Sequence, residues 1–106
     1  RVGVDWWKSP TIDRAHVARP AGGYGEYDGT LVNFEGLVQR ARAAVRPWGE
    51  AEPAWRVLVG LGRRFGLGGE YVTAASVFDE AASALPPFAG LSHRALGHLG
   101  APVKGA

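Results

Sequence analysis

The sequence predicts an α/β chain in which short strands and a glycine-rich loop precede two or three helices. Three observations support this fold class. The first twenty residues alternate short apolar segments with a proline turn, as at the edge of an α/β sheet. The stretch 21–29 is rich in glycine, which favours an open loop. Apolar residues in the second half recur at spacings of three and four, which is the period of an amphipathic helix.

The amino-terminal region is expected to form a strand, a turn, a short helix and a second strand. Residues 2–5 indicate the end of a buried strand, and Pro10 fixes the backbone of the turn that follows it. Thr11 is the expected cap of a single helical turn over 12–15. Residues 16–20 then indicate a short extended segment that its arginine and proline close.

The middle of the chain is less clearly patterned. Residues 31–34 follow the glycine-rich loop, and the run 37–45 after them is ambiguous between extended structure and helix. Two prolines and a glycine then mark a further loop over 47–53.

Two amphipathic helices and one short helical turn are expected after that loop. The first helix covers 55–65 and ends at the glycines that follow it. Thr73 is the expected cap of the second helix, which the proline pair at 86–87 stops. Ser92 is expected to cap one more turn, and 97–106 is expected to be irregular. The side chains expected to supply the packing are Trp55, Leu58, Phe65, Val77, Phe78, Ala81, Ala82 and Leu85.

Composition limits the kind of protein. At 106 residues there is room for at most one small domain, expected here as a single partial domain with a strand and loop region at 1–46 and a helical region at 47–106. The sequence has no methionine and begins at Arg1, from which we expect a fragment of a longer chain. No apolar run approaches the roughly 18 to 20 residues of a membrane span, so any attachment to a membrane is expected to be through partners.

The absence of cysteine excludes disulfides, thiolate metal sites and cysteine nucleophiles within this segment. The net charge is +2, and the arginines are spread along the sequence instead of forming one basic block. We therefore expect no nucleic-acid partner, since such binding needs basic residues clustered on one face. Four tryptophans are expected to act as core anchors and not as stacking platforms for bases: Trp6, Trp7, Trp48 and Trp55.

The stretch 57–66 resembles a strand that enters a dinucleotide-binding loop, but its spacing is wrong. Such a loop needs three glycines in the order G-x-G-x-x-G, and Phe65 occupies the third position. A helix that tolerates Gly60 and Gly62 is the favoured interpretation. For the histidines, the spacing of five between His93 and His98 does not suit an i, i+4 metal pair, so no metal site is expected.

A more distinctive group of residues follows the glycine-rich loop. Gly29, Thr30, Asn33 and Glu35, with Gly36 and Gln39 after them, combine glycines that permit tight turns with side chains that bond to nearby backbone. We expect this group to lock a loop at a junction. If Asn33 and Glu35 are buried and bonded, replacing either with alanine should destabilise that loop by about 1 to 3 kcal/mol.

The order of these residues resembles the molybdopterin oxidoreductase superfamily, and within it the large iron–sulfur subunit of NADH-quinone oxidoreductase. The resemblance covers almost the whole chain. It comprises the segment 15–21, the acidic Glu26, the group that begins at Gly29, the segment 47–51, the helix that Trp55 leads and the later stretch 71–97.

The resemblance implies a structural role in the peripheral arm of a respiratory complex I, where electrons pass from NADH to quinone. It implies other subunits as partners, a peripheral position on the cytoplasmic side of the inner membrane, and iron–sulfur clusters elsewhere in the polypeptide. No catalytic residue, metal or cofactor is expected in this segment, and Gly29, Thr30, Asn33 and Glu35 are the candidates for cofactor contact.

Two alternatives remain open. The first is a fragment of a molybdopterin-dependent oxidoreductase such as a formate dehydrogenase, in which the loop would neighbour a pterin–guanine dinucleotide. The second is a small independent module that binds an anion or nucleic acid through arginine and tryptophan side chains. Molybdenum and pterin in the parent protein would favour the first, and a steep loss of binding with added salt would favour the second.

Overall fold

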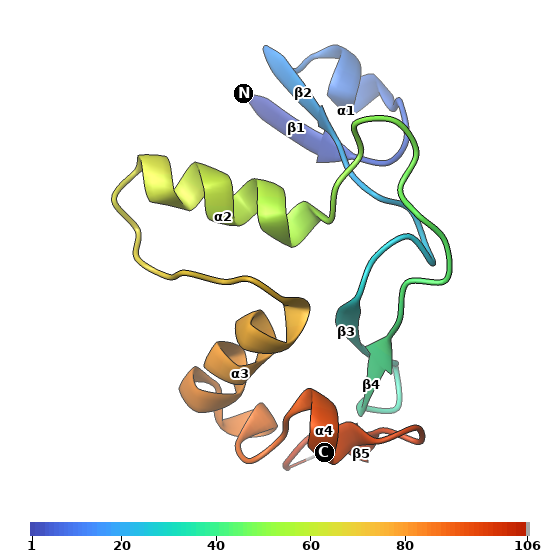
Figure 1. Cartoon of the computed structure of the whole chain (residues 1–106), viewed down its shortest axis with the longest axis vertical. Helices are drawn as coiled ribbons and strands as arrows, with labels where there is room; N and C mark the ends of the chain where they lie inside the picture. Colours follow the sequence, from blue (N-terminus) through green and yellow to red (C-terminus); the bar gives the residue numbers. More distant parts are fainter. Residues whose placement is uncertain (106) are drawn as a thin grey trace. The chain divides into compact units, whose positions relative to one another are not determined.

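The computed structural model describes residues 1–105, which form two compact units (Figure 1). Unit 1 comprises Arg1–Tyr27 and Ala43–Glu70, and unit 2 comprises Asp28–Arg42 together with the described residues from Tyr71 onward. Short strands and several helices confirm the predicted α/β class. The predicted division into a strand and loop region at 1–46 and a helical region at 47–106 stays a prediction. Each compact unit contains residues from both of these regions.

In unit 1, two short parallel strands are joined through one helical turn. Strand β1 (Val2–Asp5) pairs with β2 (Val17–Pro20), and helix α1 (Pro10–Asp13) lies in the connection and packs against β1. This is the predicted order of elements. A Cβ atom built on Gly3 would lie 2.6 Å from Ile12 Cδ1, so a larger residue there would force the Ile12 side chain to shift.

The cap of α1 differs from the prediction. Ser9 occupies the cap position in extended conformation, and its Oγ accepts a hydrogen bond from the backbone N–H of Ile12 at 3.4 Å. Thr11 lies inside the helix and does not cap it. The reason is that Pro10 takes the first helical position, where its missing N–H costs nothing, and this moves the cap one residue before it.

Helix α2 (Ala54–Arg64) completes unit 1 and contacts β1. It begins after Pro53 and ends at Phe65, and Gly66 follows with φ of +72°. The stretch 57–66 is therefore mainly helical, as favoured over the dinucleotide loop. Leu58 and Phe65, which were predicted to pack, are instead 59% and 75% exposed. Helical period identifies an apolar face, but whether that face is covered depends on tertiary contacts.

Unit 2 is built on an antiparallel sheet in the order β3–β4–β5. Strand β3 (Gly29–Val32) pairs with β4 (Leu37–Ala41), which resolves the ambiguous run as strand up to residue 41. Strand β5 (Ala101–Pro102) pairs with the start of β4, so the prediction of an irregular tail is wrong at these two residues. A two-residue strand has no periodicity to detect, and only its distant partner defines it.

Two helices pack on this sheet, and a 3₁₀ turn contacts the first of them. Helix α3 (Ala74–Ala84) contacts β3, the 3₁₀ turn η1 (Pro86–Phe88) follows it, and α4 (His93–Leu96) contacts β4. The predicted caps are confirmed at both α-helices. Thr73 and Ser76 form a reciprocal capping box at α3. Ser92 Oγ accepts from the backbone N–H of Ala95 at 3.1 Å at α4.

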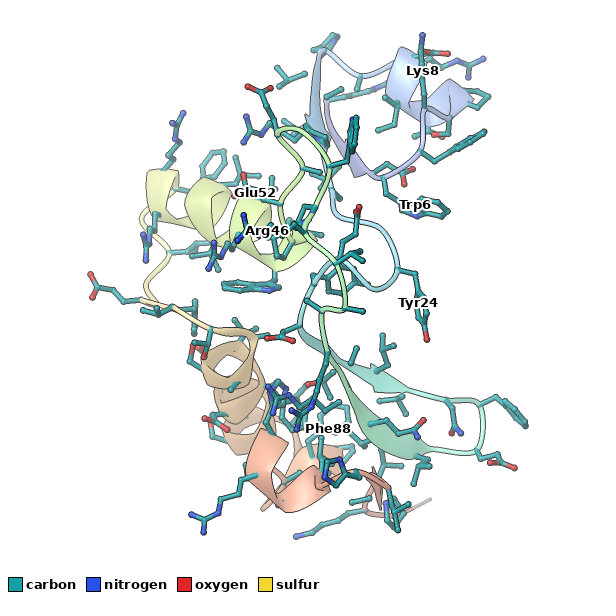
Figure 2. The ribbon with its side chains drawn as sticks, turned by 45° about the vertical axis from the view of Figure 1, so that its right-hand side comes forward. Trp6, Lys8, Tyr24, Arg46, Glu52 and Phe88 are labelled. Carbon is teal, nitrogen blue, oxygen red and sulfur yellow. The ribbon has the colours of Figure 1, made fainter. Side chains whose placement is uncertain are left out.

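The hydrophobic core of the described chain lies in unit 2. Val38 of β4, Phe78 of α3 and Leu96 of α4 form its buried centre. Phe88 meets Phe78 edge to face, with ring centroids 5.8 Å apart, and lies among the elements of this unit in Figure 2. Of the predicted inner face of α3, Phe78 and Ala82 are buried and Val77 and Ala81 are half-buried, whereas Leu85 is exposed.

The tryptophans of unit 1 depart from their prediction as core anchors. Trp6, Trp7 and Trp48 are all largely exposed, and Trp48 reaches 88%. Figure 2 shows the side chain of Trp6 projecting away from the ribbon, as does that of Tyr24. Trp55 is half-buried, with the Arg56 guanidinium 5.3 Å from its ring centroid. Unit 1 therefore presents several uncovered aromatic side chains.

Candidate functional site

The candidate site of unit 2 is organised around a buried histidine. His93 is the first residue of α4 and only 8% exposed, and its Nε2 lies 2.7 Å from the Oγ1 of Thr30 on β3. The imidazole also stacks on the ring of Phe78 with centroids 5.7 Å apart. One hydrogen bond and one ring contact from two other elements thus fix the imidazole in place.

The surroundings of His93 disfavour its charged form. Burial lowers the pKa of the imidazole from its usual value, because a charge loses hydration there. The positive charge of Arg40 lowers the pKa further, whereas Asp79 acts in the opposite direction. The neutral imidazole is therefore the form that the folded structure favours.

Asn33 organises the turn between β3 and β4. Its side-chain Oδ1 accepts hydrogen bonds from the backbone N–H groups of Glu35, at 3.0 Å, and Leu37, at 2.9 Å. Gly36 lies between these two with φ of +77°, a conformation that glycine adopts without steric cost. The side chain of Asn33 thus holds both sides of a turn that its glycine makes possible.

The other candidates of this group contribute in different ways. Gly29 begins β3 and pairs with Ala41 at the open end of the hairpin. The Glu35 side chain is exposed and forms no hydrogen bond with any residue of the described chain. Gln39 is also exposed. The structure therefore brings Thr30 into the neighbourhood of His93 but does not bring Glu35 there. Cofactor contact by Gly29, Thr30, Asn33 or Glu35 stays a prediction.

An open hollow of about 620 Å³ lies beside His93 on unit 2. Arg40 on β4, Arg42 just after it and Arg94 on α4 bring three guanidinium groups to its lining. The Nε of Arg40 is buried and has no hydrogen-bond partner among the residues that the structure describes. The full lining consists of Arg40, Arg42, Ala75, Asp79, Ser92, His93, Arg94, Gly97 and His98.

Sequence reasoning missed this cationic hollow. It treated the arginines as scattered, since 52 positions separate Arg42 from Arg94 in the sequence. Antiparallel pairing of β4 and the packing of α4 on it bring them together. The predicted cap at Ser92 was the one local signal, because it fixes the start of the helix that carries His93 and Arg94.

The two histidines other than His93 lie in different units. His16 lies in unit 1 with its Nδ1 2.7 Å from the amino-terminal nitrogen, and His98 is exposed at the hollow. Within residues 1–105, no three acidic, histidine or cysteine side chains gather as metal ligands would. None of the helices in this range has the length and apolar character that crossing a bilayer requires.

Comparison with known proteins identifies the family. The sequence model of the molybdopterin oxidoreductase family matches residues 6–64, which is more than half of the chain. The chain therefore belongs to the molybdopterin oxidoreductase family, and its short strands and helices are those of a fragment of such a domain. Membership implies a molybdopterin cofactor in the parent protein.

The curated relatives include proteins named as formate dehydrogenases. The alpha subunit of a formate dehydrogenase from Methanococcus maripaludis is 38% identical over 98 residues, which cover 91% of this chain and 14% of that protein. A putative formate dehydrogenase from Staphylococcus aureus is 34% identical over 86 residues, or 81% of this chain and 9% of that protein. A probable oxidoreductase from Bacillus subtilis is 33% identical over 95 residues, or 90% and 10%.

These relatives correct the functional interpretation. The assignment to the large iron–sulfur subunit of NADH-quinone oxidoreductase is wrong, and so are the roles in complex I, NADH oxidation and quinone reduction that followed from it. The family match over residues 6–64 includes the motif that begins at Gly29, and it supports the superfamily without supporting the complex I branch. The expected respiratory partners and membrane-side position were drawn from that assignment and stay predictions. The formate dehydrogenase alternative fits the relatives better.

Proposed function

We propose that this chain is a segment of a molybdopterin-dependent oxidoreductase of the formate dehydrogenase kind. The observation that carries the proposal is the 38% identity over 91% of the chain with the alpha subunit of a formate dehydrogenase. The chain spans about a tenth of the curated relatives it matches, so the activity would belong to a much longer polypeptide.

The residues of this segment suit the phosphate groups of the implied cofactor but supply no thiolate ligand for its metal. A pterin–guanine dinucleotide carries phosphate groups, and the guanidinium groups of Arg40, Arg42 and Arg94 can hold phosphate oxygens. The segment has no cysteine, so a thiolate ligand to the metal would have to come from elsewhere. When bound, the molybdenum–pterin group would supply the two-electron oxidation of formate to carbon dioxide.

Within such an enzyme, residues 1–106 would position backbone and charge without reacting themselves. Asn33 holds the hairpin turn, and Thr30 ties β3 to His93 on α4. The arginines beside the neutral His93 would present a fixed, positively charged surface to an anionic group. Iron–sulfur clusters in the same polypeptide stay a prediction.

The test uses the purified polypeptide that carries this sequence. Its molybdenum, pterin and iron content would be measured, followed by formate oxidation with an artificial electron acceptor. We expect molybdenum and pterin to copurify with the polypeptide, together with formate-dependent reduction of the acceptor. Molybdenum and pterin without formate oxidation would retain the cofactor class and reject the substrate. A polypeptide free of both would overturn the proposal.

A further inference from the structure

Unit 1 has almost no hydrophobic core of its own. Within residues 1–105, Ala21 is its one buried apolar side chain, whereas unit 2 has the core that includes Phe78. The sheet of unit 1 consists of two parallel strands, β1 and β2 (Figure 1). Parallel sheets occur almost only where both faces are covered, and two strands alone bury too little apolar surface to be stable. Unit 1 therefore has the organisation of one side of a larger sheet.

The hydrogen bonds of β1 show which of its backbone groups face β2. The carbonyl oxygens of Arg1 and Asp5 accept hydrogen bonds from the N–H at the start of β2 and from the N–H just after it, at 3.2 and 2.9 Å. The backbone groups of successive strand residues point to opposite sides. Val2 and Val4 therefore direct their N–H and C=O groups away from β2. No other strand of the described chain pairs with β1 on that side.

Strand β2 has the features of a sheet edge. Its last residue, Pro20, has no N–H to donate, and the carbonyl oxygen of Pro20 accepts from the backbone N–H of Glu52 at 3.4 Å. The guanidinium of Arg19 on β2 also pairs with the Glu52 carboxylate at 2.8 Å. Prolines and charged side chains protect a sheet edge from further pairing. The free side of β1 has neither at Val2 or Val4, so the sheet is open there and closed at β2.

The free side of β1 borders an open hollow of about 470 Å³. Val2 and Gly3 both line the hollow, although the side chains of successive strand residues point to opposite faces of a sheet. No residue of β2 lines it within the described chain, so the hollow lies at the edge of β1 that β2 leaves free. Helices α1 and α2 both contact β1, as helices contact an interior strand of a parallel sheet.

We propose that the free edge of β1 pairs with a further strand that the same polypeptide supplies from outside residues 1–106. The aligned regions cover 14%, 10% and 9% of three curated relatives, so most of such a polypeptide lies outside this segment. Interior strands of parallel sheets are rich in valine, isoleucine and leucine, and we expect that composition in the added strand. The inference requires a longer polypeptide but neither a cofactor nor formate oxidation.

Residue-resolved hydrogen exchange on the purified polypeptide that carries this sequence tests the pairing. The amides of Gly3 and Asp5 face β2 and are the internal reference for a formed sheet. We expect the amides of Val2 and Val4 to exchange at least about a hundredfold more slowly than their intrinsic rates, as paired amides do. Exchange of Val2 and Val4 near intrinsic rates, with Gly3 and Asp5 protected, would show a free edge and overturn the proposal. Loss of protection at all four amides would overturn it as well, because no sheet would then be formed.

Two proline variants provide a matched comparison of the two sides of the sheet. Val4→Pro removes an N–H that points away from β2, and Ala18→Pro removes one that points away from β1. We expect Val4→Pro to speed exchange at Gly3 and Asp5 at least about tenfold, because it removes a ladder hydrogen bond. Ala18→Pro should change it by no more than about threefold, as proline is tolerated on an edge. Val4→Ala controls for the lost side chain. Equal effects of the two prolines would contradict the proposal, and the wild-type pattern decides it should Val4→Pro fail to fold.

The same measurement separates the proposed strand from one that a second copy of the polypeptide supplies. Protection of Val2 and Val4 in a polypeptide that native mass shows to be monomeric supports the proposal. Protection that disappears as a dimer dissociates on dilution would assign the added strand to the second copy and overturn it. A polypeptide without molybdenum or pterin that protects Val2 and Val4 would retain this inference and overturn the function proposed above.

Discussion

The Oγ1 of Thr30 lies 2.7 Å from the Nε2 of His93 and joins two segments that stand 63 residues apart in the sequence. Thr30 belongs to the β3–β4 hairpin, whereas His93 begins α4. The contact is partly buried, so water competes with it only weakly. It therefore links the motif that identified the superfamily to the histidine beside the cationic hollow.

Removing this link should loosen α4. Thr30→Val keeps the shape of the side chain but leaves the buried His93 Nε2 without its partner, which should cost about 1 to 3 kcal/mol. Hydrogen exchange of the amides in residues 93–100 would measure the loss, because it reports local opening. Thr11→Val on the exposed α1 is the control. Equal protection of residues 93–100 in wild type and Thr30→Val would show that the contact does not stabilise α4.

The turn of the hairpin allows a sharper comparison. Asn33→Ala removes the acceptor of two backbone N–H groups, those of Glu35 and Leu37, and should destabilise the turn by about 1 to 2 kcal/mol. Glu35→Ala removes an exposed carboxylate that forms no hydrogen bond in the described chain, so it should change little. Exchange rates at residues 35–38 would distinguish the two. Equal effects of the two substitutions would contradict the role assigned to Asn33.

The sequence predicted those features that depend only on residues close together in the chain, such as helix caps. Thr73 and Ser92 were recognised as caps because a hydroxyl before a helical pattern satisfies a free N–H whatever packs around it. The strand at 37–41 remained ambiguous, since only its pairing with β3 separates it from a helix. Exposure of Trp6 and Trp48 also escaped prediction, because burial depends on which distant segment covers a side chain.

The same limit applies to the candidate site. Asn33 could be predicted to hold its own turn, because the bonds it makes are to residues two and four positions away. The gathering of Arg40, Arg42 and Arg94 at one hollow could not, because it follows from the antiparallel ladder and the docking of α4. Charge counts along a sequence do not reveal which charges share a surface.

Gly100 should be intolerant of any side chain. It has φ of +84°, and a Cβ there would collide with the carbonyl oxygen of Val38 and lie 2.8 Å from Cγ of Gln39. Gly100→Ala should therefore displace β5 from β4 and cost more than about 2 kcal/mol. Thermal unfolding of the polypeptide and hydrogen exchange at the amides of Ala101 and Val103 would measure this.

Gly25→Ala is the matched control for that substitution. Gly25 has nearly the same φ, +83°, but a Cβ there would meet no atom within 4 Å. It should cost only the backbone penalty of about 1 kcal/mol. If Gly25→Ala were as damaging as Gly100→Ala, the positive φ alone would account for the effect, and the close approach to β4 would not matter.

The stability of unit 2 should depend on pH through His93. Burial and the charge of Arg40 lower the pKa of this imidazole in the folded state, while Asp79 and Asp28 oppose the shift and Arg42 adds to it. The unfolded chain then binds the proton more readily than the folded one. Stability is therefore complete above the ordinary histidine pKa of about 6.5 and falls as the pH drops below it.

Hydrogen exchange at residues 93–100, measured between pH 7.5 and 5.0 and corrected for intrinsic rates, would test this. Protection should decrease toward acid in the wild type. His93→Gln has no titrating group and should lose this component of the dependence, whereas His98→Gln should retain it because the His98 side chain is exposed. If His93→Gln showed the same acid dependence as the wild type, other groups would be responsible. That result would mean that the folded structure accepts the charged His93 imidazole beside Arg40, so the neutral form would not be the favoured one.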